Sequence, residues 1–257
     1  MLITLNCHAK VNLGLFVKGK RPDGYHNIET AFVPVHRLYD VLTVDRVSKV
    51  YPSVFTYEGL PIPGRTADNL VQRAYQLMAE NYDRVGHVSI HLNKRIPLGS
   101  GLGGGSSDAA GVIKAINQLF SLDLGREEMA ELGARLGSDV PFFFYDEPMY
   151  ATGRGEQLAP ISLPAIQSIR VLTPGLRIAT AEAYSWLNLA DCHTDTELKS
   201  ILNQPTAKWP DLLVNDFQPV VLQRYPQLRP LLQSLYAEGA DYAALSGSGS
   251  ALFGLYL

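Results

Sequence analysis

A glycine-rich segment constrains this chain more than any other feature of its sequence. Five glycines lie between Gly99 and Gly105, directly before an alanine-rich amphipathic segment that begins at Ser106. Glycine lets backbone amides approach a ligand and adopt positive φ, and a following helix adds unpaired N–H groups and the positive end of its dipole. Together these features predict an anion site for a phosphate chain, with Ser106 and Ser107 able to cap the helix or to bind phosphate or a metal-bound water.

Other readings of this segment fit less well. No Lys follows the last glycine, as a Walker A loop requires, and the chain lacks the His-Arg-Asp and Asp-Phe-Gly motifs of protein kinases. The spacing Gly99-x-Gly101-x-x-Gly104 matches the dinucleotide fingerprint, but Pro97 interrupts the join between strand and loop. A flexible loop before an ordinary helix cap and an NAD(P) oxidoreductase remain the alternatives.

Composition limits the class of protein further. Hydrophobic residues make up 46% and charged residues 18% of the 257 positions, which excludes a disordered chain. A net charge of −3 argues against a dedicated nucleic-acid binder. The two cysteines, Cys7 and Cys192, are expected to be small buried hydrophobes in a reducing cytoplasm. Residues 1–10 lack the pattern of a secretory signal, and glycines interrupt 242–257, so no membrane span is expected.

The order of elements predicts an α+β fold in two lobes. The first third is β-rich, with a turn at 21–24, and the change in character near residue 150 suggests domains over 1–155 and 156–257. Asp68 is the expected N-cap of the first helix. Strands are predicted over 2–7, 11–17, 28–35, 41–47, 88–92, 169–172, 242–245 and 251–257, and helices over 69–81, 106–119, 127–136, 181–187, 195–202, 217–223 and 228–238.

Three segments in this order resemble the motifs of the GHMP kinases. Residues 9–13 (AKVNL) resemble the first motif, 94–110 the second and 245–251 (LSGSGSA) the third. The resemblance implies a two-lobed fold, with an N-terminal lobe like ribosomal protein S5 and a ferredoxin-like C-terminal lobe. It also implies ATP and Mg²⁺ as cofactors and transfer of phosphate to an alcohol. The Mg²⁺ ligands are not identified by any residue cluster.

Within that family, three further segments are similar to members that phosphorylate a cytidine-diphosphate sugar alcohol in non-mevalonate isoprenoid synthesis. These are 21–26 (RPDGYH), 101–108 (GLGGGSSD) and 136–142 (LGSDVPF). The resemblance implies a small-molecule partner, no nucleic acid, no membrane, and a monomer or homodimer. Members of the family continue with another helix and strand, so the C-terminal domain is expected to be shortened.

The resemblance assigns catalytic roles to Lys10 and Asp139. Lys10 corresponds to the cation beside the attacking hydroxyl, where it would stabilise an alkoxide. Asn12 shares a strand face with Lys10 and could orient the substrate or the base. Asp139 corresponds to the general base that accepts the hydroxyl proton. A surface lysine on a strand and a turn aspartate are the alternatives from sequence alone.

The resemblance also assigns substrate and nucleotide contacts. Tyr25 and His26 correspond to a pair that binds cytosine by stacking and hydrogen bonding. Thr180 and Tyr184 share a helix face, and Tyr184 would complete an aromatic sandwich around the base. Their alternatives are exposed turn residues and a core aromatic. The residues expected to bind the nucleotide are Asn69, Lys94, Pro97, Leu98, Gly99, Ser100, Gly101, Leu102, Gly103, Gly104, Gly105, Ser106 and Ser107.

Several alternatives remain open at this point. Asn69 and Lys94 could be a helix N-terminal residue and a solvated strand-end lysine. His87 and His91 lie in a strand pattern without a zinc-protease glutamate, which indicates an exposed strand face. Residues 246–250 are expected to pack against the phosphate loop, and a bare turn is the alternative. A homoserine or mevalonate kinase is expected to bind the carboxylate of its acid substrate with an arginine clamp. An inactive ligand-binding protein with the same fold is the alternative from another class.

Overall fold

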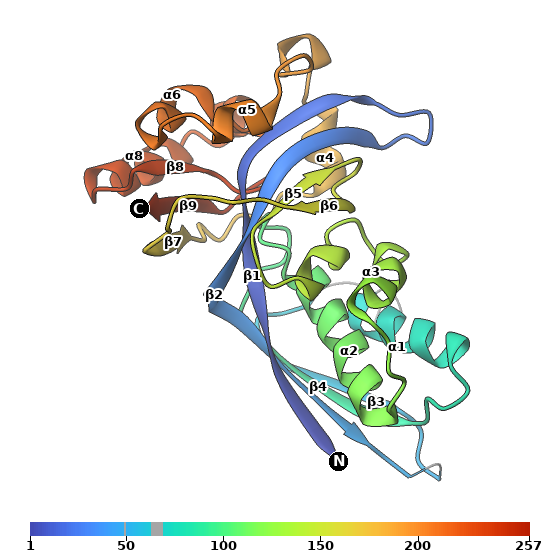
Figure 1. Ribbon diagram of the computed structural model, residues 1–257. Coiled ribbons are helices and arrows are strands. Elements are labelled where there is room, and N and C mark those ends of the chain that lie inside the picture. The colour runs from blue at the N-terminus through green and yellow to red at the C-terminus, as the bar shows by residue number, and fades with distance from the viewer. Residues whose placement is uncertain (49, 63–68) are drawn as a thin grey trace. The chain divides into compact units, whose positions relative to one another are not determined.

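The computed structural model describes residues 1–48, 50–62 and 69–257. The chain forms two compact units, each built from several segments (Figure 1). The first unit comprises Met1–Ala9, Val35–Leu98 and Gly103–Asp146, and the second comprises Lys10–Pro34, Gly99–Leu102 and Glu147–Leu257. The predicted division after residue 155 is a single cut, whereas these units interleave along the chain. The domain boundary after residue 155 stays a prediction.

Two long strands replace the four strands predicted in the first third of the chain. They are β1 (Leu2–Lys20) and β2 (His26–Arg46). The polar residues between the predicted strands do not end them, because Lys10, for example, is buried and donates a hydrogen bond to Asn12. The predicted turn at 21–24 is confirmed, with Gly24 at φ +86° and its N–H donating to the Arg21 carbonyl over 3.1 Å.

The first unit pairs a small sheet with helices. Its strand order is β3-β4-β2, with β3 parallel and β2 antiparallel to β4. Helices α1 and α2 pack against each other, and η2 packs against α2 and α3. Along β4 buried and partly exposed residues alternate, as expected for a strand with one covered face. The elements are β3 (Val54–Gly59), α1 (Leu70–Asn81), β4 (Val88–Lys94), α2 (Gly104–Phe120), α3 (Arg126–Ala134) and the 3₁₀ helix η2 (Val140–Phe144).

Local sequence signals predicted these helices, with errors at their starts. Asn69 is the N-cap of α1, where its Oδ1 accepts from the Val71 N–H over 2.9 Å. The predicted cap, Asp68, lies outside the described residues. Helix α2 begins at Gly104, two residues before the predicted start. Its Gly111 packs so tightly that a Cβ would lie 2.5 Å from the Sγ of Cys7.

The second unit contains two groups of antiparallel strands. The start of β2 pairs with β5 (Met149–Thr152), which pairs with β6 (Gln157–Pro160). A separate three-stranded sheet has the order β7-β9-β8. Its strands are β7 (Ser168–Leu172), β8 (Tyr242–Leu245) and β9 (Leu252–Tyr256). Strands β3, β5 and β6 were not predicted, since only the pairing in the sheet marks these short segments as extended.

Short helices complete the second unit. A buried apolar cluster that includes Ile178, Phe217 and Leu235 holds them together. Within the described ranges, every helix is too short or too polar to traverse a lipid bilayer. The helices are α4 (Thr180–Ser185), η3 (Leu189–Asp191), α5 (Leu198–Leu202), η4 (Thr206–Lys208), α6 (Trp209–Leu212), α7 (Phe217–Arg224) and α8 (Leu228–Ala237).

The cysteines differ in their surroundings. Cys7 is 4% exposed, as expected for a small buried hydrophobe, and burial raises the pKa of its thiol. The same prediction is wrong for Cys192, which is only partly buried beside the short helix η3. Both cysteines carry free thiols.

Candidate active site

Lys10 and Asn12 form a buried polar pair on β1 in the second unit. The Lys10 Nζ donates to Asn12 Oδ1 over 2.6 Å, and Asn12 Nδ2 donates to Thr30 Oγ1 over 3.1 Å. Thr30 extends this series of hydrogen bonds, because its hydroxyl donates to the Gly14 carbonyl over 2.6 Å. The predicted shared face is confirmed, and the alternative of a surface lysine is wrong, since Lys10 is 3% exposed.

This network orients the ammonium of Lys10. Its Nζ also lies 4.9 Å from the centre of the Phe32 ring, within the range of a cation–π contact. Amide, hydroxyl and ring together hold a charge that burial alone would disfavour. A fixed cation of this kind can stabilise negative charge on a nearby oxygen.

The first part of the glycine-rich segment lies in the second unit, where its carbonyl groups accept hydrogen bonds from backbone N–H groups of other segments. Gly99 O accepts from the Ile178 N–H over 3.1 Å, and Leu102 O accepts from the Lys10 N–H over 2.9 Å. Between them, Ser100 O accepts from the Ala251 N–H over 3.0 Å. The loop is therefore anchored on both sides and directly bonded to the residue that carries the buried ammonium.

The turn after β8 packs against this loop, as predicted for residues 246–250. The Ser246 hydroxyl donates to Gly101 O over 3.0 Å. Gly101 has φ +79°, and a Cβ there would lie 2.0 Å from the Ser246 carbonyl oxygen. Asn215 supports the same turn, because its Nδ2 donates to Leu245 O and Gly247 O over 2.8 and 2.9 Å. Only glycine fits at position 101.

The second part of the segment opens α2 in the first unit without a side-chain cap. Gly103 is the N-cap at φ +71°, and the first bond of the helix runs from the Ser107 N–H to Gly103 O over 2.9 Å. The predicted caps, Ser106 and Ser107, lie inside the first turn instead, so that prediction is wrong. The N–H groups of the first turn have no partner within the helix, and such groups suit an anion.

A buried ion cluster lies beneath the start of α2. Lys94, 1% exposed, donates from Nζ to Asp108 Oδ2 over 2.7 Å and to Asp40 Oδ2 at short range. Asp40 Oδ1 also accepts from the N–H groups of Arg95 and Ile96. The alternative of a solvated strand-end lysine is wrong. A contact between Lys94 and the nucleotide stays a prediction.

Burial and charge shift the pKa values in this cluster. Burial raises the pKa of Asp108 to about 7, with Lys94 opposing the shift and Asp40 adding to it. Burial disfavours the charge on Lys94, but the two carboxylates outweigh it and raise the pKa of the ammonium. Asp108 Oδ1 is buried without a hydrogen-bond partner, which is consistent with a carboxyl group that resists ionisation.

Asp139 lies in the first unit, between α3 and η2. It takes the N-cap position of η2, where Pro141 fixes the backbone of the first turn. Its side chain is partly buried, whereas the five residues of η2 that follow are all buried. The sequence 136–142 therefore folds as a tight turn that presents one carboxylate in front of an apolar segment.

The predicted cytosine residues cluster in the second unit, although in an unexpected arrangement. The rings of His26 and Tyr184 stack directly, with centroids 4.4 Å apart and planes 13° from parallel. Tyr184 rests in turn on the edge of Phe217, at 4.9 Å. Burial, with Lys20 adding to it, lowers the pKa of His26 and favours the neutral ring at pH 7, which has one donor and one acceptor nitrogen.

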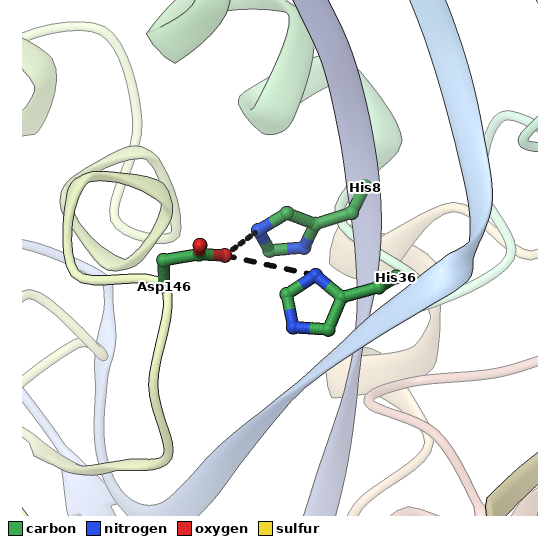
Figure 2. Close-up of side chains that lie close together, drawn as sticks. All are labelled: His8, His36 and Asp146. Carbon is green, nitrogen blue, oxygen red and sulfur yellow. Dashed lines mark ion pairs between the residues drawn. The ribbon is translucent and has the colours of Figure 1, made fainter.

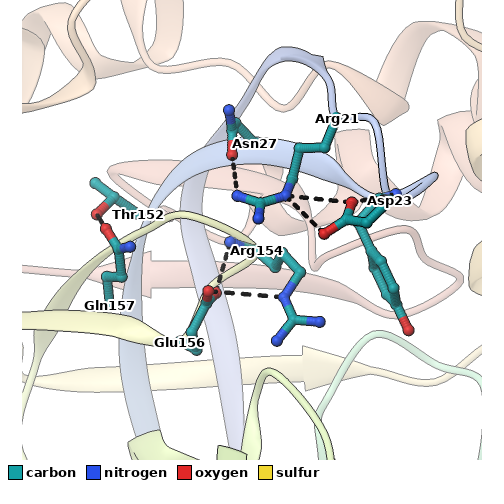
Figure 3. Close-up of polar contacts among 8 residues, drawn as sticks. Arg21, Asp23, Asn27, Thr152, Arg154, Glu156 and Gln157 are labelled. Carbon is teal, nitrogen blue, oxygen red and sulfur yellow. Dashed lines mark hydrogen bonds and ion pairs between the residues drawn. The ribbon is translucent and has the colours of Figure 1, made fainter.

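Tyr25 is 55% exposed at the tip of the hairpin between β1 and β2, and the Arg154 guanidinium lies 4.9 Å from its ring centre. Figure 3 shows the polar contacts around this hairpin. Arg21 pairs with Asp23 over 3.1 Å, and Arg154 pairs with Glu156 over 3.6 Å. Both guanidinium groups are thus engaged by carboxylates.

The remaining predicted positions make contacts with residues of their own units. Thr180 begins α4, and its Oγ1 accepts from the Ser248 hydroxyl over 3.3 Å, which links it to the turn at 246–250. Asn69 caps α1. His91 is half-exposed on β4, as predicted, with Nδ1 2.9 Å from Thr56 Oγ1. Sequence reasoning missed Asp40, because it lies between two predicted strands with other charged residues, Arg37 and Asp45, nearby.

Comparisons with known proteins identify the family of this chain. The chain matches the family models for the GHMP kinases N terminal domain over residues 69–147 and GHMP kinases C terminal over residues 196–257. It is 41% identical over 251 residues to 4-diphosphocytidyl-2-C-methyl-D-erythritol kinase of Azobacteroides pseudotrichonymphae genomovar. CFP2, which covers 97% of this chain and 91% of the relative.

Two further relatives give the same result. The kinase of the same name from Cytophaga hutchinsonii (strain ATCC 33406) is 42% identical, over 97% of this chain and 90% of the relative. A crystal structure of 4-(cytidine 5'-diphospho)-2C-methyl-D-erythritol kinase superposes with a TM-score of 0.82 at 36% identity, over 98% of this chain and 90% of that chain. The predicted α+β fold of this family is confirmed, and the chain belongs to the GHMP kinases.

Proposed function

We propose that this chain transfers a phosphate group from ATP to the 2-hydroxyl of 4-diphosphocytidyl-2-C-methyl-D-erythritol, a step of non-mevalonate isoprenoid synthesis. The observation that carries the substrate assignment is the shared name of relatives about 40% identical over 97% of the chain. The GHMP kinases are ATP-dependent phosphotransferases, which supplies the donor.

The start of α2 fits a phosphate group. Its N-cap is a glycine with no side-chain cap bond, so the N–H groups of the first turn are available to an anion. The hydroxyls of Ser106 and Ser107 add hydrogen-bonding groups in the same turn. We assign the ATP phosphates to Pro97–Ser107. Mg²⁺ would neutralise phosphate charge when bound, and the serine hydroxyls are the type of oxygen ligand it takes.

Phosphoryl transfer depends mainly on positioning and charge stabilisation, and the proposed catalytic residues supply both. Lys10 holds a buried positive charge that favours the ionised form of the attacking hydroxyl. Asn12 keeps the Lys10 ammonium in place through its 2.6 Å bond. Asp139 accepts the proton of the hydroxyl as general base.

The hairpin and α4 supply the proposed cytidine contacts. The exposed ring of Tyr25 offers a face for stacking on the base. The ring of His26 is covered by Tyr184, so its edge rather than its face is available for hydrogen bonds. We therefore assign Tyr184 to holding His26 in place, and the sandwich around the base stays a prediction. Thr180 lies on the same helix as Tyr184.

The arginines near Tyr25 do not favour an acidic substrate. Arg21 and Arg154 are each paired with a carboxylate, Asp23 and Glu156, so they do not form a free clamp. This arrangement argues against homoserine or mevalonate as the substrate. An inactive binding protein is also disfavoured, since Lys10 and Asp139 are both present. Mg²⁺ dependence, a monomeric or homodimeric state, a cytoplasmic location and the absence of a nucleic-acid partner stay proposals.

Release of ADP tests the proposal. The purified chain is incubated with Mg-ATP and either 4-diphosphocytidyl-2-C-methyl-D-erythritol, homoserine or mevalonate, and ADP is followed with a coupled reporter. We expect turnover with the cytidine substrate alone. Turnover with homoserine or mevalonate instead, or ATP binding without turnover on any of the three, would overturn the proposal.

A further inference from the structure

Three metal-ligating side chains meet in the first unit, and none of them has a role in the function proposed above. His8 on β1, His36 on β2 and Asp146 after η2 point toward one another in Figure 2. His8 Nε2 lies 3.1 Å and His36 Nδ1 lies 3.7 Å from Asp146 Oδ1. In the described part of the chain, this is the one group of three or more such residues whose ligand atoms all lie within 4.8 Å of one another.

The other nitrogen of His8 fixes how its ring can be protonated. Nδ1 lies 2.9 Å from the Ala9 carbonyl oxygen, which can only accept, so Nδ1 carries a proton. In the neutral ring, Nε2 then points a lone pair at the carboxylate oxygen of Asp146. Two acceptors at 3.1 Å repel each other unless a cation lies between them, either a second proton on His8 or a metal ion.

The surroundings of His8 hold its ring in one orientation. The side chain is only 12% exposed, and its ring lies 5.4 Å from Phe143 and 6.5 Å from Phe142, so it is largely shielded from water. A backbone carbonyl on the far nitrogen of a histidine is also the usual partner that orients a metal-bound imidazole.

The spacing suits a small tetrahedral ion. Bonds of about 2.0–2.1 Å from nitrogen and oxygen ligands place neighbouring ligand atoms of a tetrahedral zinc ion about 3.3 Å apart. The two separations from Asp146 Oδ1, 3.1 and 3.7 Å, bracket that value, and all three ligand atoms lie within 4.8 Å of one another. His36 and Asp146 are 59% and 64% exposed, which leaves the fourth position open to water.

We propose that His8, His36 and Asp146 bind one divalent transition-metal ion of the zinc class. Two imidazole nitrogens and one carboxylate select such ions over Mg²⁺, which prefers oxygen ligands. The site is thus separate in chemistry from any Mg²⁺ that accompanies ATP. Because its ligands come from β1, β2 and the segment after η2, the ion would cross-link three parts of the first unit.

One neighbouring charge works against tight binding. The ammonium of Lys114 is bonded to the Phe143 carbonyl over 2.5 Å and interacts electrostatically with Asp146. This positive charge weakens attraction of a cation to the site. The affinity should therefore rise in a Lys114→Met variant, whose loss of charge leaves the three ligands in place.

Zinc titration of the untagged, chelator-treated protein by isothermal calorimetry tests the site. We expect one ion per chain, and weakening by at least about tenfold in His36→Ala and in Asp146→Asn, since even indirect partners of metal ligands are worth 10–100-fold. Both side chains are exposed, so both variants should fold. His91→Ala is the matched control, because His91 is also half-exposed and lies 3.7 Å from a carboxylate, on Glu58.

Cobalt provides a second readout that does not depend on catalysis. Co²⁺ in a tetrahedral site with nitrogen ligands gives visible absorption, which should appear on titration of the wild type and of His91→Ala. It should be absent in His36→Ala and Asp146→Asn. Absence of binding in the wild type, or equal binding by all variants, would overturn the proposal and leave His8 and Asp146 as an ion pair. Equal affinity for Mg²⁺ would also contradict it.

Discussion

Asp139 carries the proposed proton transfer at the scale of single residues. Asp139→Asn keeps the size of the side chain but removes the group that accepts the hydroxyl proton. Because general-base catalysis typically contributes about 10²–10⁴-fold, we expect kcat to fall by at least about 100-fold. Steady-state ADP release measures kcat in the wild type and in the variant.

The control for Asp139 is Asp123→Asn, which changes an exposed aspartate in the same unit. It should leave kcat unchanged. An Asp139→Asn variant that melts at the wild-type temperature and keeps wild-type turnover would contradict the assignment.

Asp108 gives the chain a pH-dependent stability. Burial raises its pKa to about 7 in the folded state, from an ordinary value of 3.8. Between these values the folded state binds more protons than the unfolded state, so this contribution is fully present below pH 4 and is lost as pH rises through 7. The melting temperature of the wild type should therefore fall relative to that of Asp108→Asn as pH increases from 4 to 7.

Thermal melts of both proteins across this range measure the effect, with Asp83→Asn as a control at an exposed position. The gap between wild type and Asp83→Asn should not follow the same trend. A gap between wild type and Asp108→Asn that stays constant from pH 4 to 7 would show that the carboxyl group ionises normally.

Tyr25 separates binding of the cytidine substrate from binding of ATP. Tyr25→Ala removes the exposed ring proposed to stack on the base, a contact worth about 1–3 kcal/mol in other base-binding proteins. We expect the substrate KM to rise by about tenfold or more and the ATP KM to stay unchanged. Tyr57→Ala, at another exposed tyrosine, is the control. Equal weakening of both substrates, or of neither, would count against the assignment.

At the scale of elements, the glycine-rich loop depends on close packing of backbone on backbone. In Gly101→Ala the new Cβ would lie 2.0 Å from the Ser246 carbonyl oxygen, and φ is +79°. The left-handed backbone alone costs about 1–2 kcal/mol for a residue with a side chain. At about 2–4 °C per kcal/mol, the melting temperature should fall by several degrees, with weakened ATP binding.

Gly125→Ala is the matched control for the loop. Gly125 is the N-cap of α3, has φ −70°, and a Cβ there would meet nothing within 4 Å. We expect wild-type ATP binding in this variant. Differential scanning fluorimetry with and without ATP measures both effects, and a Gly101→Ala variant as stable and as ATP-responsive as Gly125→Ala would show that the loop does not need this packing.

Local patterns made some elements predictable from sequence. Helix α2 and strand β4 were predicted because hydrophobic spacing and the glycines before α2 act over a few residues. The continuity of β1 and β2 was not predicted, since it depends on hydrogen bonds between residues distant in sequence. The same reason hid the burial of Lys94 between Asp40 and Asp108, which are 54 and 14 residues away.

The candidate site likewise has features that a local sequence pattern predicts and features that depend on distant contacts. Lys10 and Asn12 could be placed on one face from strand periodicity alone. The stacking of His26 on Tyr184 joins β2 to α4 across more than 150 residues, a contact that no local pattern encodes. Serine caps were predicted for α2 because serine favours that position generally, whereas here a glycine in the left-handed region takes it.

At the scale of the whole molecule, the similarity to named kinases extends over 97% of the chain rather than over the motifs alone. Coverage alone would show a shared fold, but these relatives are also 41% and 42% identical to the chain. Identity at this level over nearly the whole chain favours one substrate class over the others handled by proteins of this fold. The central claim is the identity of that substrate.

Phosphorus NMR of a complete reaction tests this claim most directly. The chain is incubated with Mg-ATP and 4-diphosphocytidyl-2-C-methyl-D-erythritol, in parallel with homoserine and mevalonate. We predict one new phosphomonoester resonance, equimolar with ADP, in the cytidine reaction only, with the diphosphate resonances of the substrate retained. ADP without a phosphomonoester, or a phosphomonoester formed from homoserine or mevalonate at the same rate, would contradict the account.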